Sequence, residues 1–336
     1  MKTFANRNAR SLEDAVRLAR AAREAGQSVS FAGGGTDLLQ LVKDRVPNRP
    51  GSGAPDVLVN LKTIPGMDQV GAGPGGALSI GGLVTLAALA ADSRVRERFQ
   101  AVAEAAESVA TPQIRNVGTV AGNLAQRPWC WYYRNGFPCY KAGGDRCFSA
   151  GGENQLHAIL GGGPSYIVHP SDMAPALVAM DATFRVVGPA GERTMPAADF
   201  FVLPRADAER ENVLGDDELL AAVDIPAPAA GVRSTYHKVM DRETWTHALV
   251  SAAVALDLQG DVCESARIVL GGVAPVPWRV PEAERMLVGQ RVTPELAARV
   301  GEVAVSGARP LAKNAYKVTL TRNVVARTLR DLAGVV

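Results

Sequence analysis

Three of the four cysteines of this chain lie in one short loop rich in aromatic and basic residues. Cys130, Cys139 and Cys147 fall within eighteen residues of a chain of 336. Thiols clustered in this way are difficult to explain by core packing and are typical ligands of a soft metal centre. Structural zinc sites usually show cysteine pairs separated by about two to four residues, whereas the intervals here are eight and seven residues. An iron–sulfur cluster is therefore favoured, with zinc or a disulfide plus a free thiol as alternatives.

A [4Fe-4S] cluster requires a fourth ligand, and the chain offers two candidates. His157 follows Cys147 by ten residues, whereas Cys263 lies far away and is equally well explained as a small buried residue. Histidine replaces cysteine at iron in some clusters and raises the potential. We expect His157 to be the ligand, with Cys263 or solvent as alternatives. Four basic residues in the loop are expected to offset the cluster's negative charge: Arg127, Arg134, Lys141 and Arg146.

Two glycine-containing segments precede the cysteines and have the composition of phosphate-binding loops. In the first, Gly33–Gly35 separates a predicted strand from a predicted helix, with Ala32, Thr36 and Asp37 beside it. Backbone N–H groups of such a turn, together with a helix N-terminus, hold a pyrophosphate without a lysine. The second segment, 111–124, offers Thr111, Gly118, Thr119, Gly122 and Asn123. Each segment alone is also consistent with a plain turn, but together they indicate a dinucleotide cradle.

A third glycine pattern, Gly71-x-Gly73-x-x-Gly76, matches the dinucleotide fingerprint only in its letters. That fingerprint must end a strand and open a helix. Here Pro74 lies inside it and a strand-like stretch follows. We therefore interpret it as a hairpin turn.

The elements that must position these residues alternate between helix and strand. Ser11 and Asp14 resemble a capping box at the start of a helix that ends at Gly26. Further helices are expected at 36–43, after Thr85, and at 101–110, 294–306 and 323–332. Strands are expected at 28–31, 57–61, 77–80, 249–258 and 266–271, and the start of another strand at 117–120. Ser171 and Asp172 precede a predicted helix as caps. The Pro/Ala/Gly-rich stretch 225–231 is the expected domain boundary.

Composition excludes several classes of protein. The net charge of +2 gives no general reason to expect nucleic acid or a membrane surface as a partner. No apolar run approaches the roughly 20 residues that span a bilayer, and the N-terminus lacks a hydrophobic signal core. Four cysteines do not make a disulfide scaffold. We expect a cytoplasmic protein, or a periplasmic one exported together with a partner that carries the signal.

Four motifs in order resemble one known family. They are Ala-Gly-Gly-Gly-Thr-Asp-Leu-Leu at 32–39, Arg-Asn-Val-Gly-Thr-Val-Ala-Gly-Asn-Leu at 115–124, His-Pro-Ser-Asp-Met-Ala-Pro-Ala-Leu at 169–177, and Val-Leu-Gly-Gly-Val-Ala-Pro-Val-Pro-Trp-Arg at 269–279. The chain is similar to the FAD-binding medium subunit of the xanthine dehydrogenase/aldehyde oxidase family, over nearly its whole length. The cysteine insert resembles that of members with an extra [4Fe-4S] cluster, as in bacterial aldehyde oxidoreductase of the periplasmic type, although no fourth cysteine lies in this insert.

The resemblance implies an α+β fold in two domains. Residues 1–226 would form a two-subdomain FAD-binding module of the vanillyl-alcohol-oxidase (PCMH) type, with the iron–sulfur insert at about 126–164. Residues 227–336 would form a small C-terminal domain of the CO dehydrogenase flavoprotein type. Gly33–Gly35, Thr36 and Asp37 would hold the FAD pyrophosphate, and the second loop would form the facing wall. Asp172 would contact ribityl or ribose hydroxyls, and Lys238 would lie beside the isoalloxazine ring.

The implied function is electron transfer in an oxidoreductase complex of three subunits. A molybdenum-cofactor large subunit would hydroxylate an aldehyde or N-heterocycle, and a small subunit with two [2Fe-2S] clusters would pass electrons to the FAD of this chain and on to an acceptor. No residue of this chain is expected to be catalytic. A stand-alone FAD-dependent oxidoreductase of a small substrate is the main alternative, and an iron–sulfur assembly scaffold is a third. Neither an attachment residue for covalent flavin nor a substrate base is evident.

Overall fold

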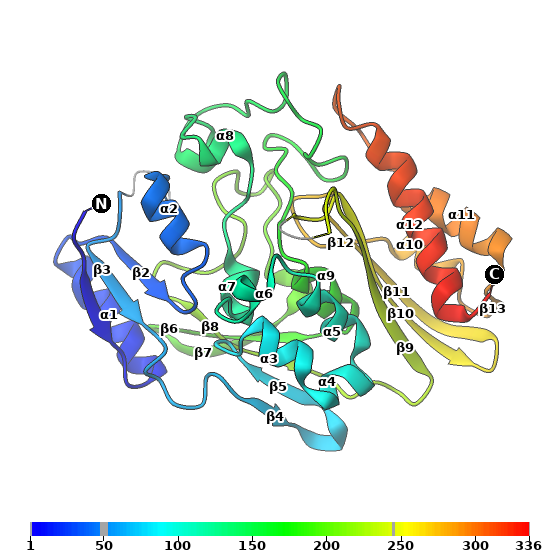
Figure 1. Cartoon of the computed structure of the whole chain (residues 1–336), viewed down its shortest axis with the longest axis horizontal. Coiled ribbons are helices and arrows are strands. Elements are labelled where there is room, and N and C mark those ends of the chain that lie inside the picture. The colour runs from blue at the N-terminus through cyan, green and yellow to red at the C-terminus, as the bar shows by residue number, and fades with distance from the viewer. Residues whose placement is uncertain (1, 48–52, 244–245, 336) are drawn as a thin grey trace.

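The computed structural model describes residues 2–47, 53–243 and 246–335, whose strands form three sheets (Figure 1). The first sheet is parallel, in the order β1-β3-β2, and consists of β1 (Ala5–Asn8), β3 (Val57–Asn60) and β2 (Val29–Ala32). Helix α1 (Leu12–Glu24) connects β1 to β2, and α2 (Leu38–Asp44) follows β2. The Ser11 side chain accepts the Asp14 N–H, so the predicted cap of α1 is confirmed.

The second sheet is antiparallel, with the strand order β4-β5-β8-β6-β7. Its strands are β4 (Val70–Ala72), β5 (Leu78–Gly81), β8 (Leu219–Ile225), β6 (Thr183–Gly188) and β7 (Gly191–Pro196). A 3₁₀ turn, η1 (Pro74–Gly76), connects β4 to β5. The Gly71–Gly76 pattern is therefore a hairpin, as predicted.

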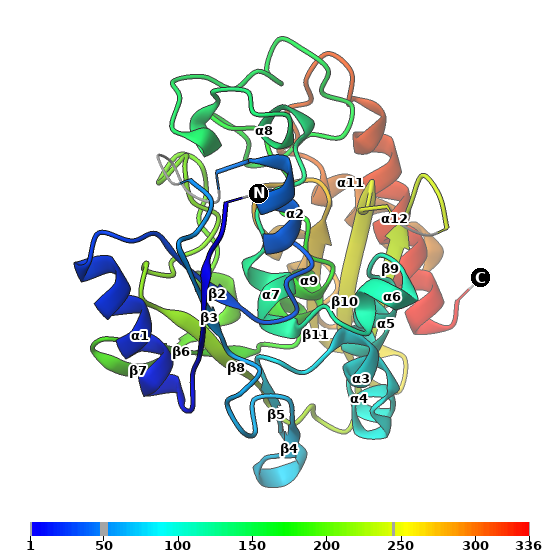
Figure 2. The same ribbon diagram turned by 60° about the vertical axis from the view of Figure 1, so that its left-hand side comes forward.

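Short helices lie before, within and after the cysteine insert. They are α3 (Leu86–Ala91), α4 (Ser93–Arg98), α5 (Gln100–Glu107), α6 (Pro112–Arg115), α7 (Val120–Ala125), α8 (Trp131–Arg134), η2 (Tyr140–Ala142), α9 (Met173–Ala179) and η3 (Ala197–Asp199). Between α7 and α9 the chain is mostly irregular and rises above the rest of the molecule as the loops around α8 (Figures 1 and 2).

The third sheet belongs to the C-terminal part, in the order β12-β11-β10-β9 with β13 also paired to β11. Its strands are β9 (Val232–Val239), β10 (Val250–Gln259), β11 (Val262–Gly271), β12 (Trp278–Arg279) and β13 (Gln290–Arg291). The helices are α10 (Pro281–Arg285), α11 (Pro294–Ala304) and α12 (Tyr316–Ala333). The predicted β10–β11 hairpin around residues 259–261 is confirmed.

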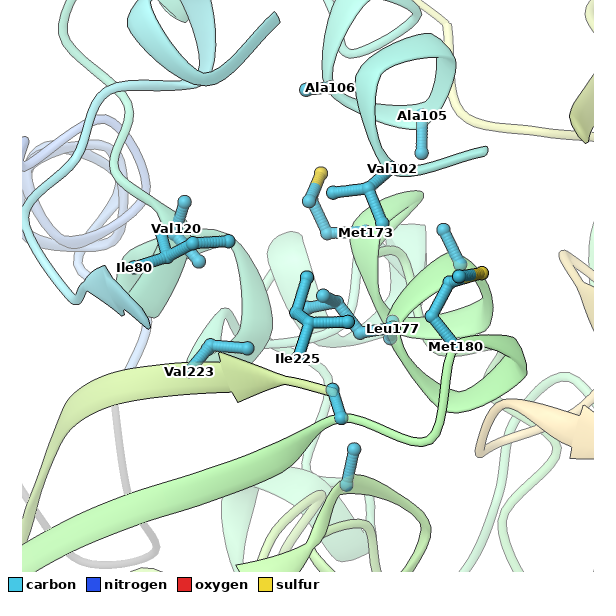
Figure 3. Packing of buried hydrophobic residues seen from close by; sticks show 14 of the residues in the cluster. Ile80, Val102, Ala105, Ala106, Val120, Met173, Leu177, Met180, Val223 and Ile225 are labelled. Carbon is cyan, nitrogen blue, oxygen red and sulfur yellow. The ribbon is translucent and has the colours of Figure 1, made fainter. Parts of the chain in front are cut away.

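Alternate residues of β10 enter two different cores, because successive side chains of a strand point to opposite faces. Val250, Val254 and Leu256 pack in the core beneath α11 and α12. Ala253 and Ala255 join the large core of the N-terminal part. Figure 3 shows this large core, in which side chains of α5, α7 and α9 meet those of β5 and β8. The C-terminal sheet is thus buried on both faces, and it packs firmly against the N-terminal part.

Two expectations for local structure are wrong. The strand predicted to start at 117–120 is absent, because the Thr119 side chain accepts the Gly122 N–H and caps α7 instead. The last helix begins at Tyr316 and not at 323. Its first turns carry buried Lys317 and Thr321, polar residues that obscure the apolar pattern.

Within the described ranges, no helix has the length and apolar character needed to cross a bilayer.

Candidate flavin cleft and cysteine site

The two glycine loops predicted to form a cradle lie against each other. A Cβ atom added to Gly34 would overlap the carbonyl oxygen of Val117 in the second loop. One added to Gly33 would lie 3.2 Å from the Thr119 Oγ1 atom. Glycine is thus needed at 34 for the close approach of two backbone segments, whereas a Cβ atom at 33 would be in tight contact with the Leu83 and Thr119 side chains. At Gly35 the reason is conformational, since its φ is +77°.

Beside these loops runs an open cleft of ≈ 410 Å³. Seven of the thirteen predicted flavin-binding residues line it: Gly33, Gly34, Gly35, Thr36, Asp37, Thr119 and Gly122. The opposite wall comes from the segment 209–220, which the sequence analysis did not single out. A cleft of this size, lined by glycine backbone, suits an extended ligand with phosphate groups.

The other six predicted residues, Ala32, Thr111, Gly118, Asn123, Asp172 and Lys238, do not line this cleft. Three of them support the loops: Thr111 caps α6, the Gly118 carbonyl accepts the Leu86 N–H, and the Asn123 Oδ1 atom accepts the Ser171 hydroxyl at 2.6 Å. Ala32 ends β2. Their contacts with a flavin stay predictions.

Asp172 and Lys238 are bound to each other in the interior. The Lys238 Nζ atom lies 2.7 Å from one Asp172 oxygen, and the Tyr236 hydroxyl donates to the other at 2.6 Å. Burial raises the pKa of Tyr236 well above its usual value, so this hydroxyl stays protonated. The predicted helix cap is provided by Ser171, whose hydroxyl oxygen accepts the Ala174 N–H.

Asp37 connects the first glycine loop to the cysteine insert. One of its oxygens accepts the backbone N–H of Arg127 at 3.0 Å, and the other lies 2.7 Å from a guanidinium nitrogen of Arg134. The Arg134 side chain is only 8% exposed and also lies over the Trp129 ring. The insert is therefore anchored at the edge of the cleft.

A second anchor is a buried group of charges that the sequence analysis missed. Glu211 is 2% exposed and pairs with Arg127 at 2.5 Å and with Lys141 at 2.8 Å. Burial lowers the pKa of Lys141, and the nearby carboxylate opposes that shift. Glu211 stands in a charged run, 205–211, that resembles an exposed loop. No local signal distinguishes it from its exposed neighbour Glu209.

The structure brings the three clustered thiols together. Cys130, Cys139 and Cys147 line one small hollow with Tyr132 and Phe148. Burial raises the pKa of Cys130 to about 11 and also raises the pKa of Cys139. These thiols therefore stay protonated at neutral pH unless a metal displaces the protons.

His157 reaches the same group of side chains. Its Nε2 atom lies 3.3 Å from the Cys130 Sγ atom, and its buried Nδ1 atom has no hydrogen-bond partner. Burial lowers the pKa of His157 to about 4, so the ring is neutral and able to act as a ligand. The donor set, three thiols and a neutral imidazole, is chemically suited to an iron–sulfur cluster.

The geometry differs from that of a single-ion site. Within the described residues, no group of three or more His, Cys, Asp or Glu side chains is placed to hold one metal ion. The hollow measures ≈ 10 Å³, room for about one water molecule. A cluster at this point requires the surrounding side chains to turn outward.

Cys263, the alternative fourth ligand, lies elsewhere. It is fully buried on β11 in the C-terminal core, and its thiol donates to the Ser265 carbonyl at 3.3 Å. The four basic residues expected to balance a cluster each have a carboxylate partner: Arg127 and Lys141 with Glu211, Arg134 with Asp37, and Arg146 with Asp145. Their charges are therefore already compensated within the protein.

Comparison with known proteins decides the family. The model of the FAD binding domain in molybdopterin dehydrogenase matches residues 2–228, and that of the CO dehydrogenase flavoprotein C-terminal domain matches residues 235–332. The chain belongs to the xanthine dehydrogenase/aldehyde oxidase family. Within it, this chain is a FAD-binding medium subunit.

Individual relatives agree with this assignment. The FAD-binding subunit of an aldehyde oxidoreductase from Escherichia coli (strain K12) is 34% identical over 90% of both chains. The carbon monoxide dehydrogenase medium chain of Hydrogenophaga pseudoflava is 26% identical over 90% of this chain and 89% of its own. A solved carbon monoxide dehydrogenase structure from the same organism has a TM-score of 0.76 at 25% identity, covering 99% of this chain and 98% of the other.

The family confirms several predictions. The mixed fold of a FAD-binding domain followed by a C-terminal domain is confirmed. So are FAD as a cofactor and the function of an oxidoreductase's flavin subunit in electron transfer. The glycine cradle fits FAD, because the backbone of Gly33–Gly35 lines an open cleft that suits an extended ligand with phosphate groups.

Proposed function

We propose that this medium subunit passes electrons from a molybdenum-cofactor large subunit through FAD to an acceptor, and that it carries an additional [4Fe-4S] cluster. In this proposal a small subunit with two [2Fe-2S] clusters feeds the FAD, the three subunits form a heterotrimer, and the complex oxidises an aldehyde or an N-heterocycle. One observation carries the proposal: a single side chain connects the glycine cleft to the thiol hollow. Arg127 lines the cleft, and its guanidinium group donates at 2.8 Å to the carbonyl of Lys141, which lines the hollow.

The cleft residues hold the flavin in this proposal. Gly33–Gly35 provide backbone approach, and Thr36, Thr119 and Gly122 complete the same wall. Bound FAD supplies the exchange between two-electron and one-electron chemistry, and the chain orients it and excludes water. Asp172, Lys238 and the remaining predicted residues do not line the cleft, and in this proposal they contact the part of the FAD that extends beyond it.

The cluster ligands in this proposal are Cys130, Cys139, Cys147 and His157. Support comes from the shared hollow of the thiols and from the neutral imidazole of His157 beside Cys130, whose Nδ1 atom has no hydrogen-bond partner. Metal binding then compensates for the deprotonation of buried thiols. We also propose a domain boundary at 226/227, in the connection between β8 and β9, and a cytoplasmic location, or a periplasmic one by co-export.

Analysis of the native complex tests the proposal. We expect one FAD per chain, molybdenum in the complex, and more iron than two [2Fe-2S] clusters contain. Cys130→Ser, Cys139→Ser and Cys147→Ser should each lose the additional iron while retaining FAD. Cys263→Ser is the matched control, because a serine hydroxyl still donates to the Ser265 carbonyl. Iron determination and electron paramagnetic resonance provide the readout.

Substitutions of His157 test whether it, and not Cys263, is the fourth ligand of the cluster. His157→Cys should keep the cluster and lower its potential, since a thiolate adds negative charge, and His157→Ala should leave a labile cluster that loses iron. Iron loss in Cys263→Ser with none in His157→Ala would reverse the assignment. Purification of a homo-oligomer that oxidises a small substrate alone would instead favour the stand-alone oxidoreductase.

A further inference from the structure

The turn that carries His157 is held along its whole length by the start of the last helix. Each of the six residues 153–158 contacts a residue of the segment 313–317, which we name the α12 clamp. The two segments are about 160 positions apart in the chain and lie side by side above the C-terminal sheet (Figure 2). The clamp thus holds the turn through contacts to each of its residues.

The contacts cover every residue of the turn, although they do not follow one register. Lys313 pairs with Glu153, and its backbone N–H donates to the Asn154 Oδ1 atom at 2.9 Å. The remaining contacts reach backbone carbonyls: Tyr316 to Gln155 at 3.0 Å, Lys317 to Leu156 at 3.0 Å, and Asn314 to His157 at 3.0 Å and Ala158 at 3.2 Å.

The central members of the clamp are deeply buried. Asn314 and Lys317 are both 0% exposed. The Lys317 ammonium group also donates to the Gly272 carbonyl at 2.7 Å, just after β11, and the Asn314 Oδ1 atom accepts the Leu311 N–H at 2.6 Å. Burying polar side chains is costly unless their hydrogen bonds are made. These two residues therefore fix the backbone at 156–158 to the C-terminal domain.

The thiols are supported from the opposite side. Their insert is anchored on the N-terminal part through Asp37 and Glu211. His157 and Cys130, whose atoms lie 3.3 Å apart, thus stand on segments with different main anchors. The segments also touch directly, since the Tyr132 hydroxyl oxygen accepts the Glu153 N–H at 2.6 Å. The packing of the C-terminal domain against the FAD-binding part therefore contributes to the distance between His157 and Cys130, together with these direct contacts.

We propose that Asn314 and Lys317 are positioning residues that hold His157 at the fourth ligand position of the cluster. The inference rests on the proposed cluster function. It adds that the C-terminal domain completes the metal site, so that the cluster lies where the two domains meet. The chemistry required of the clamp is only hydrogen bonding to carbonyls, with no contact to iron.

The test compares Asn314→Ala and Lys317→Met with wild type, each as the full chain in its native complex. We expect both variants to lose at least half of the additional iron per FAD and to show a changed electron paramagnetic resonance spectrum. FAD per chain should stay within a tenth of the wild-type value. Lys313→Met is the matched control, because its ammonium group is exposed and pairs with the exposed Glu153 side chain, while the backbone N–H that bonds Asn154 is kept. It should leave both readouts unchanged.

The outcomes separate the two hypotheses. If wild type itself lacks the additional cluster, the proposed function fails. If wild type contains it and both variants keep the same iron content and spectrum, the clamp proposal is wrong. Parallel loss of FAD and iron in both variants also overturns it, since that pattern reports general unfolding.

Discussion

The flavin cleft depends mainly on contacts between backbone segments, whereas the cysteine insert depends on contacts between side chains. In the cleft, the backbone at Gly34 approaches the backbone of the second loop at Val117, and each of the two loops is marked by glycines close together in sequence. In the insert, buried side chains carry the structure, and their partners, such as Glu211 and Asn314, lie 70 or more residues away. A site made of backbone is thus recognised from a short motif, whereas a site made of side-chain pairs depends on distant residues with no local signal.

The largest expected effect concerns the buried charges beneath the insert. Glu211→Gln should destabilise the chain by about 3–5 kcal/mol, because it leaves Arg127 and Lys141 buried without a carboxylate. Denaturant unfolding of the full chain measures the loss. Glu209→Gln, at an exposed neighbouring position, should change stability by less than about 0.5 kcal/mol. Equal effects of the two substitutions would show that this buried group does not support the insert.

A smaller effect is expected from the backbone contact of the cleft. Gly34→Ala should cost about 3 kcal/mol and remove most of the bound FAD, because the new methyl group overlaps the Val117 carbonyl and separates the loops. The loss of FAD is expected because the two loops are pushed apart, without any direct clash between the new methyl group and a phosphate of FAD. Gly151→Ala, where nothing lies within 4 Å, is the control. Full retention of FAD in Gly34→Ala, measured by absorbance, would refute the site assignment.

The smallest effect concerns the link between the two regions. Asp37→Asn should cost about 1–2 kcal/mol, because Arg134 loses a charged hydrogen-bond partner. A double-mutant cycle with Arg134→Met should give a coupling of about 1 kcal/mol. Asp44→Asn, at an exposed position of the same helix, should be nearly neutral. Additive effects in the cycle would mean that the cleft and the insert are independent.

Much of the fold was predictable because its signals are local. The Ser11 cap, the Thr85 cap and the hairpin at 259–261 depend on neighbouring residues, and the structure contains all three. The strand expected at 117–120 was a wrong interpretation of a local signal, because the β-rich composition of Val117–Val120 outweighed the ability of Thr119 to cap a helix through the Gly122 N–H. Lys317 and Thr321 concealed the first turns of α12, since buried polar residues look like an exposed face in sequence.

The sequence by itself determined the glycine loops, the three clustered cysteines and the order of motifs that identifies the family. Each of these depends on residue type and short spacing, which a linear sequence states directly. Only the tertiary structure decided that Gly34 faces Val117, that Asp172 binds Lys238, and that Glu211 is buried between two cations. The same holds for the clamp of Asn314 and Lys317 on the turn of His157. Burial and pairing between distant segments follow from packing of the whole chain, and no local pattern encodes them.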